Sequence, residues 1–297
     1  MKIYFIFSNR AEFSLLSPFI KYFKTKCTIK SIDFSKKINN LDLDKNLSKV
    51  YDICFSILSK QKVDYVIILG DRRETPLIAY AAFMLNIKII HVAAGEFVPR
   101  VTSYDQYLRP IVSILSFAQI VFSNKAKNEV QKLFNGLSNF KANVHILGNP
   151  VFKGIDIINL SRTFSENYDL VLLHPQSLSK KNTQDDIQFL KKYLKNKKTI
   201  FIYGNHDRNF DLIEQFYKKL KKKSNYLFFE NMPKEKYFSL VKYCDTFYTN
   251  SSSISEIEYI TKSIKTIGKR NRNRSKMIID DKSPEKLYQL LEKNQKK

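Results

Sequence analysis

Asp-Tyr-Val-Ile-Ile-Leu-Gly-Asp at residues 64–71 and Ile-Ile-His-Val-Ala-Ala-Gly-Glu at residues 89–96 are the stretches that decide the fold. Each is a short β-branched run that ends in a glycine followed at once by a carboxylate. Such runs, separated by a helical segment, predict strands of a parallel α/β sheet, whose carboxyl edge is where ligands bind. Asp105 and Arg109 follow just downstream, four residues apart. The pattern predicts a reaction site rather than a solvated surface.

Glycine is scarce in this chain. There are seven glycines in 297 residues, where an average usage of about 7% would give roughly twenty. Five of the seven close short apolar, strand-like runs, at positions 70, 95, 148, 204 and 268. Glycines kept at such positions predict tight turns or backbone that lies close to a ligand.

The rest of the chain alternates strand-like and amphipathic helical runs, which predicts an α/β fold of two Rossmann-like domains. Gly148-Asn149-Pro150 interrupts the alternation. We therefore expect domains at 1–149 and 150–297, with a cleft between their carboxyl edges. The predicted strands lie near 2–7, 28–33, 64–69, 87–91, 119–122, 143–147, 169–173, 199–203, 226–229, 245–248 and 264–267. The helices expected in the first half lie near 11–25, 44–60, 75–86, 103–117 and 125–135, and the last helix runs from 283 to 294.

The composition indicates a globular protein, with 43% hydrophobic and 27% charged residues. No apolar run approaches the ~20 residues needed to span a bilayer. The apolar start is broken by Asn9-Arg10 too early for a secretory signal, so we expect a cytoplasmic protein without membrane insertion. The three cysteines are widely spaced, which favours neither a disulfide framework nor a zinc site.

The net charge of +23 raises the alternative of nucleic-acid binding. The lysines are spread along the chain, and only residues 269–276 form a dense basic patch. Because that alternative depends on charge alone, we expect no nucleic-acid partner.

Several polar groups follow predicted strands. Arg10 opens the first helix, where helix amides and a guanidinium suit a phosphate, although no Gly-x-Gly-x-x-Gly precedes it and NAD is not expected. His174 ends the first strand of the second half and is compatible with either a structural or a ligand-binding role. Ser251 to Ser253 precede Glu256, a pattern that suits a diphosphate and ribose or, alternatively, a capping box.

These motifs, in this order, resemble those of UDP-N-acetylglucosamine 2-epimerases. The resemblance runs from Ser8 to Arg274 and includes Ser-Asn-Arg-Ala-Glu, Gly-Asp-Arg-Arg-Glu, His-Val-Ala-Ala-Gly-Glu, Asp-x-x-x-Arg, Gly-Asn-Pro, His-Pro, Gly-Asn-His-Asp, Asn-Ser-Ser-Ser and Gly-Lys-Arg-x-x-x-Arg. It implies the two-domain fold of GT-B glycosyltransferases, with a C-terminal helix that returns to the first domain. A homodimer is compatible with the resemblance.

The branch of the family is predicted from one motif. Non-hydrolysing relatives carry His-Val-Glu-Ala-Gly, whereas this chain has Ala93 at the position of that glutamate and an acid just after the glycine. This arrangement resembles the hydrolysing branch, which feeds sialic acid and related nonulosonic acids. The chain departs from the branch pattern at Ala93, Ala94, Pro110 and Ile114, and its Asn-Ser-Ser-Ser motif reaches its glutamate one residue early.

The resemblance implies elimination of UDP across C1–C2 and then addition of water, which gives a free 2-epimeric sugar of the N-acetylmannosamine type. Because the C2 proton is not acidic, the step requires a positioned carboxylate base and stabilisation of the leaving diphosphate. Glu96 and Asp105 are expected nearest the chemistry, with Asp71 and Glu74 as second base or sugar ligand and Arg109 holding Asp105 or the sugar. The residues expected to hold UDP are Arg10, His174, Asn205, Ser251, Ser252, Ser253, Glu256, Arg270 and Arg274. Neither a cofactor nor a metal is expected, since the acids have no histidine partners at ligand spacing.

Two other functions remain open at this point. A GT-B glycosyltransferase that uses a UDP-sugar would share the nucleotide half but would also need an acceptor groove. A catalytically inactive nucleotide-sugar-binding homologue would fit the replacements at Ala93, Pro110 and Ile114.

Overall fold

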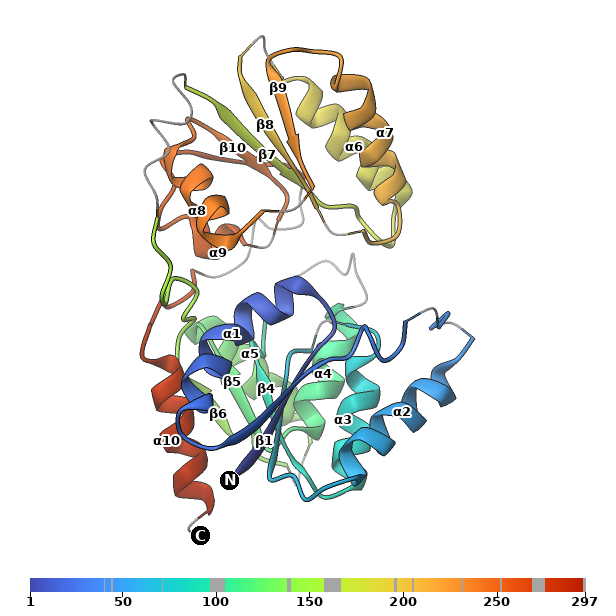
Figure 1. Ribbon diagram of the computed structural model, residues 1–297, viewed down its shortest axis with the longest axis vertical. Coiled ribbons are helices and arrows are strands. Elements are labelled where there is room, and N and C mark those ends of the chain that lie inside the picture. The colour runs from blue at the N-terminus through green and yellow to red at the C-terminus, as the bar shows by residue number, and fades with distance from the viewer. Residues whose placement is uncertain are drawn as a thin grey trace. The chain divides into compact units, whose positions relative to one another are not determined.

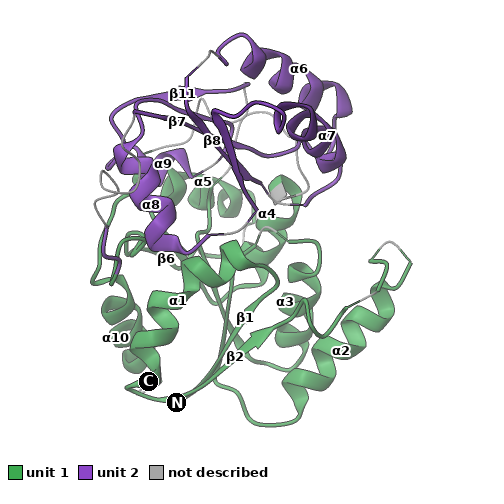
Figure 2. Cartoon of the chain, turned by 45° about the horizontal axis from the view of Figure 1, so that its top comes forward, with its two compact units in different colours: residues 1–97, 104–154, 275–297 green, residues 98–103, 155–274 purple. Residues whose placement is uncertain are grey.

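The computed structural model describes residues 1–39, 41–43, 45–70, 72–96, 105–137, 140–157, 167–194, 197–204, 206–230, 232–251, 253–268 and 276–295. These residues form two compact units, which Figure 2 colours separately. Unit 1 contains the described residues within 1–97, 104–154 and 275–297, and unit 2 contains those within 155–274.

Unit 1 is built on six parallel strands in the order β2-β1-β3-β4-β5-β6. The chain steps from β1 to the edge strand β2 and then resumes on the other side of β1 with β3. The strand order therefore reverses between β1 and β3, and such a switch point opens a crevice at the carboxyl ends of the strands. The strands are β1 (Lys2–Phe7), β2 (Thr28–Asp33), β3 (Tyr65–Ile68), β4 (Lys88–Val92), β5 (Ala118–Val121) and β6 (Val144–Ile146).

Helices cover both faces of this sheet because alternate strand residues point to opposite sides. In β1, Ile3 and Phe5 pack against one set of helices, whereas Tyr4 and Ile6 pack against the other. The first set is α1 (Arg10–Lys24) and α10 (Ser283–Gln295), and the second is α2 (Leu47–Ser59), α3 (Thr75–Met84) and α4 (Asp105–Leu115). A further helix, α5 (Asn124–Asn135), packs near β5 and β6. Figure 1 shows the α/β layering.

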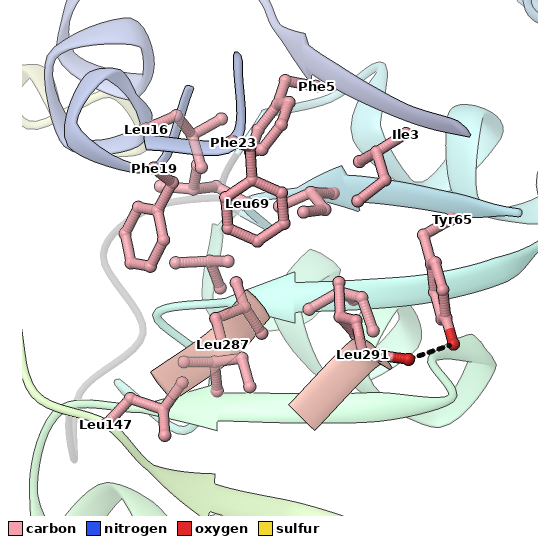
Figure 3. Packing of buried hydrophobic residues seen from close by; sticks show 14 of the residues in the cluster. Ile3, Phe5, Leu16, Phe19, Phe23, Tyr65, Leu69, Leu147, Leu287 and Leu291 are labelled. Carbon is pink, nitrogen blue, oxygen red and sulfur yellow. Dashed lines mark hydrogen bonds between the residues drawn. The ribbon is translucent and has the colours of Figure 1, made fainter. Parts of the chain in front are cut away.

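The C-terminal helix α10 belongs to unit 1, as the family resemblance implied. Leu287 and Leu291 are completely buried in the same core as Phe19 and Phe23 of α1 (Figure 3). The Tyr65 hydroxyl of β3 donates a hydrogen bond to the Leu291 carbonyl at 3.3 Å. The helix is therefore an integral layer of the first domain.

Unit 2 is built on five parallel strands in the order β11-β10-β7-β8-β9. Its switch point lies between β7 and β10. The strands are β7 (Asp169–Leu173), β8 (Thr199–Tyr203), β9 (Tyr226–Phe229), β10 (Phe247–Thr249) and β11 (Ile264–Thr266). The helices are α6 (Lys180–Lys191), α7 (Phe210–Leu220), α8 (Lys234–Tyr243) and α9 (Ile254–Ile257).

The predicted α/β class is confirmed, and each predicted strand range overlaps an observed strand. The helix expected at 44–60 begins later, at Leu47, where Asn46 makes no side-chain cap. Within the described residues, no helix is long and apolar enough to cross a membrane.

Candidate functional site

The candidate residues that the structure describes lie at the carboxyl edges of the two sheets. In unit 1, Arg10 follows β1 and Glu74 follows β3, on either side of the switch point. In unit 2, His174 follows β7 and Ser251 follows β10, which flank the second switch point. The parallel strands therefore deliver polar groups to the places where α/β folds bind ligands.

The turn between β1 and α1 is closed by two side-chain hydrogen bonds. The Asn9 side chain accepts the Glu12 amide N–H at 2.8 Å, and the buried Glu12 carboxylate accepts the Ser8 amide N–H at 2.6 Å. Two of the amides near this helix terminus are therefore already bonded. An anion at this turn would rely mainly on the exposed Arg10 guanidinium and the remaining amides.

Glu74 is a buried acid at the start of α3. Its side chain is 1% exposed, and Oε1 lies 3.5 Å from Nε of Arg72. Oε2 has no hydrogen-bond partner among the described residues. A buried carboxylate oxygen without a hydrogen-bond donor lowers the stability of the fold, because no donor offsets its loss of hydration. Oε2 of Glu74 can therefore accept a hydrogen bond from a ligand.

Glu96 is delivered by a strained turn at the end of β4. Ala93 has φ +59° and Gly95 has φ +75°, both in the left-handed region. A Cβ on Gly95 would lie 2.2 Å from the Ala126 carbonyl oxygen of α5, so only glycine fits there. Glu96 itself is 5% exposed.

Arg109 joins the ends of two neighbouring strands. Its Nη1 donates to the Glu96 carbonyl at 2.6 Å, and the side chain is buried. The Arg109 side chain also packs against Gly70, two residues after the end of β3. A Cβ added to Gly70 would lie 3.2 Å from Cγ of Arg109. The predicted contact partners Asp105 and Arg109 both belong to α4, but the Asp105 side chain lies outside the description.

His91 belongs to the core beneath this edge. The ring is fully buried, and Nδ1 lies 2.9 Å from the Ser113 hydroxyl. A Cβ on Gly70 would lie 2.4 Å from Nε2, so the glycine makes room for the ring. Burial, together with the Arg109 charge, lowers the pKa of His91 to about 3. The imidazole is therefore neutral near pH 7.

In unit 2, the backbone of His174 is held by Asn250. The His174 amide donates to Asn250 Oδ1 at 2.8 Å, and Asn250 Nδ2 donates to the His174 carbonyl at 2.8 Å. A Cβ on Gly204 would lie 2.8 Å from His174 Nδ1, which explains a glycine at the end of β8. The half-buried imidazole is therefore placed at the carboxyl edge with little freedom of its backbone.

The serine turn after β10 does not form the capping box that its sequence allows. Ser253 is the N-cap residue of α9 with helical φ −65°, and its side chain makes no cap hydrogen bond. The Ser251 hydroxyl instead accepts the Ser253 amide N–H at 3.2 Å and lies 2.9 Å from the Ser253 hydroxyl. The capping alternative is therefore not realised, and the two hydroxyls bond each other close to the half-buried Glu256 at the start of α9.

Other predicted site residues lie outside the described residues: Asp71, Asn205, Ser252, Arg270 and Arg274. Their roles stay predictions. In the described part of the chain, no group of three or more His, Cys, Asp or Glu side chains could hold a metal ion.

Two buried acids were missed at the sequence level. Glu12 could have been found from the Asn-x-x-Glu spacing at the first helix, which is a capping signature. Asp186 of α6 accepts hydrogen bonds from Gln176 and Asn250 at 2.9 and 3.0 Å. No local pattern signals Asp186, since Asn250 is 64 residues away along the chain.

Comparison with known proteins identifies the family. The sequence matches the UDP-N-acetylglucosamine 2-epimerase family over residues 15–297. The chain belongs to this family. It is 28% identical over 258 residues to the GDP/UDP-N,N'-diacetylbacillosamine 2-epimerase (hydrolyzing) of Campylobacter jejuni, which covers 82% of this chain and 66% of that protein. It is 27% identical over 227 residues to the polysialic acid biosynthesis protein P7 of Escherichia coli, which covers 73% of this chain and 57% of that protein.

A solved structure shares the fold. The Methanocaldococcus jannaschii UDP-GlcNAc 2-epimerase, in complex with UDP-GlcNAc and UDP, superposes with a TM-score of 0.74 at 20% identity, over 98% of this chain and 99% of that one. At this identity the likeness concerns the fold, which is the two-domain, GT-B-like architecture expected from the sequence. The chain spans 66% and 57% of the length of the two curated relatives.

Proposed function

We propose that this chain is a hydrolysing 2-epimerase. Its substrate would be UDP-N-acetylglucosamine or a 2,4-diacetamido analogue, and its products the free 2-epimeric sugar and UDP, for nonulosonic or sialic acid biosynthesis. The observation that carries the proposal is the buried acid Glu96, anchored through its carbonyl by Arg109 at the carboxyl edge of unit 1. Family membership and the hydrolysing 2-epimerase activity for which the Campylobacter jejuni relative is named support the same reaction.

In the proposed reaction, unit 1 handles the protons. A carboxylate removes the C2 proton, the C–H electron pair forms the C1=C2 bond, and the C1–O bond to UDP breaks. Water then adds its oxygen to C1, and a proton is delivered to C2 on the opposite face. Glu96 and Asp105 are assigned to these transfers, with Glu74 and Asp71 as the second base or a sugar ligand. Burial of Glu74 and Glu96 supports the proposal, because a dry site strengthens interactions with developing charge.

Unit 2 is assigned to UDP. The hydroxyls of Ser251 and Ser253 suit diphosphate oxygens, and Glu256 suits ribose hydroxyls. His174 lies at the same sheet edge. Ser252, Asn205, Arg270 and Arg274 complete the proposed set together with Arg10 of unit 1.

We also propose that the protein is a homodimer that associates through α3 and α4. The exposed side chains described on these adjacent helices are all apolar: Tyr80, Phe83, Met84, Tyr107, Ile111 and Ile114. A face without charge is unusual in a chain of net charge +23, where other surfaces of two copies would repel. A second copy of the same face is therefore the partner that fits it. A cytoplasmic location stays a prediction.

Sedimentation tests the dimer. Phe83→Lys with Ile111→Lys should shift the protein from dimer to monomer, because charge would be buried at the interface. Phe140→Lys, at an exposed aromatic outside these helices, is the matched control and should leave the mass unchanged. A wild-type protein that is already monomeric at micromolar concentration would refute this interface.

The reaction is tested by following UDP-N-acetylglucosamine and its 2,4-diacetamido analogue, in separate incubations, by ¹H and ³¹P NMR without any acceptor. The proposal predicts UDP and a free sugar in equal amounts. Release of UDP only after an acceptor is added would identify a glycosyltransferase, and binding without release would identify an inactive homologue.

A further inference from the structure

The side chain of Asn250 continues the sheet of unit 2 beyond its last strand residue. Thr249 of β10 pairs with Leu172 of β7, and one step further the Asn250 amide takes the place of a strand. It accepts from the His174 amide and donates to the His174 carbonyl, both at 2.8 Å. The backbone of His174 is thus held on both sides by one side chain.

The orientation of the Asn250 amide has no alternative. Nδ2 uses one hydrogen for the His174 carbonyl and the other for Asp186 Oδ2 at 3.0 Å. Rotating the amide by 180° would place its oxygen against a carbonyl and a carboxylate, and its NH₂ against an N–H group. Asn250 is 1% exposed, so water cannot repair those contacts.

Asp186 is the anchor of this arrangement. It is 5% exposed and accepts from Gln176 Nε2 at 2.9 Å as well as from Asn250. Gly268, which follows β11, lies directly over it, since a Cβ there would meet Oδ1 at 2.3 Å. One carboxylate of α6 therefore bonds side chains that follow β7 and β10, and it lies close to Gly268 after β11.

We propose that Asn250 and Asp186 are positioning residues of the nucleotide-sugar site. They lock His174 to the Ser251–Ser253 turn, so that the groups that follow β7 and β10 are presented in a fixed relation. This inference rests on the proposed function, because it assigns the ligand of unit 2 to UDP. Neither side chain is required to touch the ligand.

The test compares three variants of the full-length chain. Asp186→Asn keeps the shape but removes the charge, and Asn250→Ala removes the bonds to the His174 backbone and to Asp186. Asn225→Ala is the matched control: its Nδ2 donates to the Lys197 carbonyl at 3.1 Å, at the opposite edge of the same sheet. Dissociation constants for UDP are measured by calorimetry well below each melting temperature, alongside kcat and KM.

The positioning role predicts that Asn250→Ala weakens UDP binding by about tenfold or more, and Asp186→Asn by a smaller factor. KM should rise more than kcat falls. Asn225→Ala should lower the melting temperature but leave UDP affinity unchanged.

The possible failures are distinguishable. If the wild-type protein binds neither UDP nor a UDP-sugar, the proposed function is wrong. If the wild-type binds UDP and both site variants bind it equally well, the positioning role is overturned. If Asn250→Ala does not fold, Asp186→Asn still decides the question. If Asn225→Ala loses as much UDP affinity as Asp186→Asn, the loss comes from general destabilisation and the positioning role is overturned.

Discussion

The carboxyl edges of the two sheets are built from different chemistry. In unit 1 the edge buries two acids: Glu74, which lies 3.5 Å from Nε of Arg72, and Glu96, whose carbonyl accepts a hydrogen bond from Arg109. In unit 2 the edge is made of amides and hydroxyls, and its buried acid Asp186 accepts two hydrogen bonds from neighbouring side-chain amides.

The difference separates proton transfer from binding. A buried carboxylate oxygen without a donor, such as Glu74 Oε2 among the described residues, can accept a hydrogen bond from a ligand. A carboxylate with its donors in place, such as Asp186, holds neighbouring groups still. The two edges should therefore respond differently to mutation.

The largest effect is expected from Glu96→Gln. This change keeps shape and hydrogen bonding but removes the base, so turnover should fall by ~10²–10⁴ with UDP affinity nearly unchanged. Asp105→Asn should behave in the same way. Glu129→Gln, which affects only an exposed pair with Lys132, is the control. Near-normal turnover in Glu96→Gln would move the base to Asp71 or Glu74.

The next largest effect is a loss of folding free energy in unit 1 as the pH falls. The pKa of His91 falls from its usual 6.5 to about 3 on folding, so the unfolded chain binds a proton below pH 6.5 that the folded chain does not. Stability is therefore fully present above pH 6.5 and is lost as pH falls toward 3, by up to about 1.4 kcal/mol per pH unit.

Urea unfolding at pH 7 and pH 5 measures this contribution. His91→Gln should reduce the difference between the two pH values by roughly 2 kcal/mol. An identical pH dependence in His91→Gln and the wild-type would contradict a buried neutral imidazole.

A smaller effect is expected from the serine turn after β10, and it should appear in binding rather than in turnover. Ser251→Ala and Glu256→Ala should each raise KM and weaken UDP binding by roughly tenfold, the size of a lost hydrogen bond to a charged group. Steady-state kinetics and calorimetry would check both. A fall in kcat with UDP affinity preserved would show that unit 2 takes part in the chemistry.

The smallest effect tests the turn that delivers Glu96. Ala93 has φ +59°, a conformation that costs a non-glycine residue roughly 1 kcal/mol, so Ala93→Gly should raise stability by about that amount. Turnover should change little. Asn86→Gly is the control, since Asn86 also has positive φ but asparagine tolerates it better. A destabilised Ala93→Gly would mean that the turn is not strained.

The sheet and its edge were predictable because their signals are local. Runs such as Tyr65–Ile68 are buried at each position and read as continuous apolar segments. The glycine and carboxylate after such a run then place Glu96 at the carboxyl edge. The start of α2 was predicted too early, because the helix begins at Leu47 without a side-chain cap.

The positioning of groups in unit 2 was not predictable in the same way. Asn250 and Asp186 are far apart in sequence, and their contact depends on how α6 packs beside β10. The serine turn was ambiguous because Ser-x-x-Glu suits both a cap and a ligand site. The outcome there is decided by the Ser251 hydroxyl, which takes the Ser253 amide.

The account assigns proton transfer to the edge of unit 1 and UDP binding to the edge of unit 2. The most direct test of this assignment is deuterium incorporation at C2 of the sugar. Wild-type protein and Glu96→Gln are incubated with UDP-N-acetylglucosamine in deuterated water, and the products are followed by NMR. The account predicts a free, C2-deuterated sugar in equal amount to UDP from the wild-type, and almost none from Glu96→Gln, which still binds UDP. A product that remains linked to UDP, or a free sugar without deuterium at C2, would contradict it.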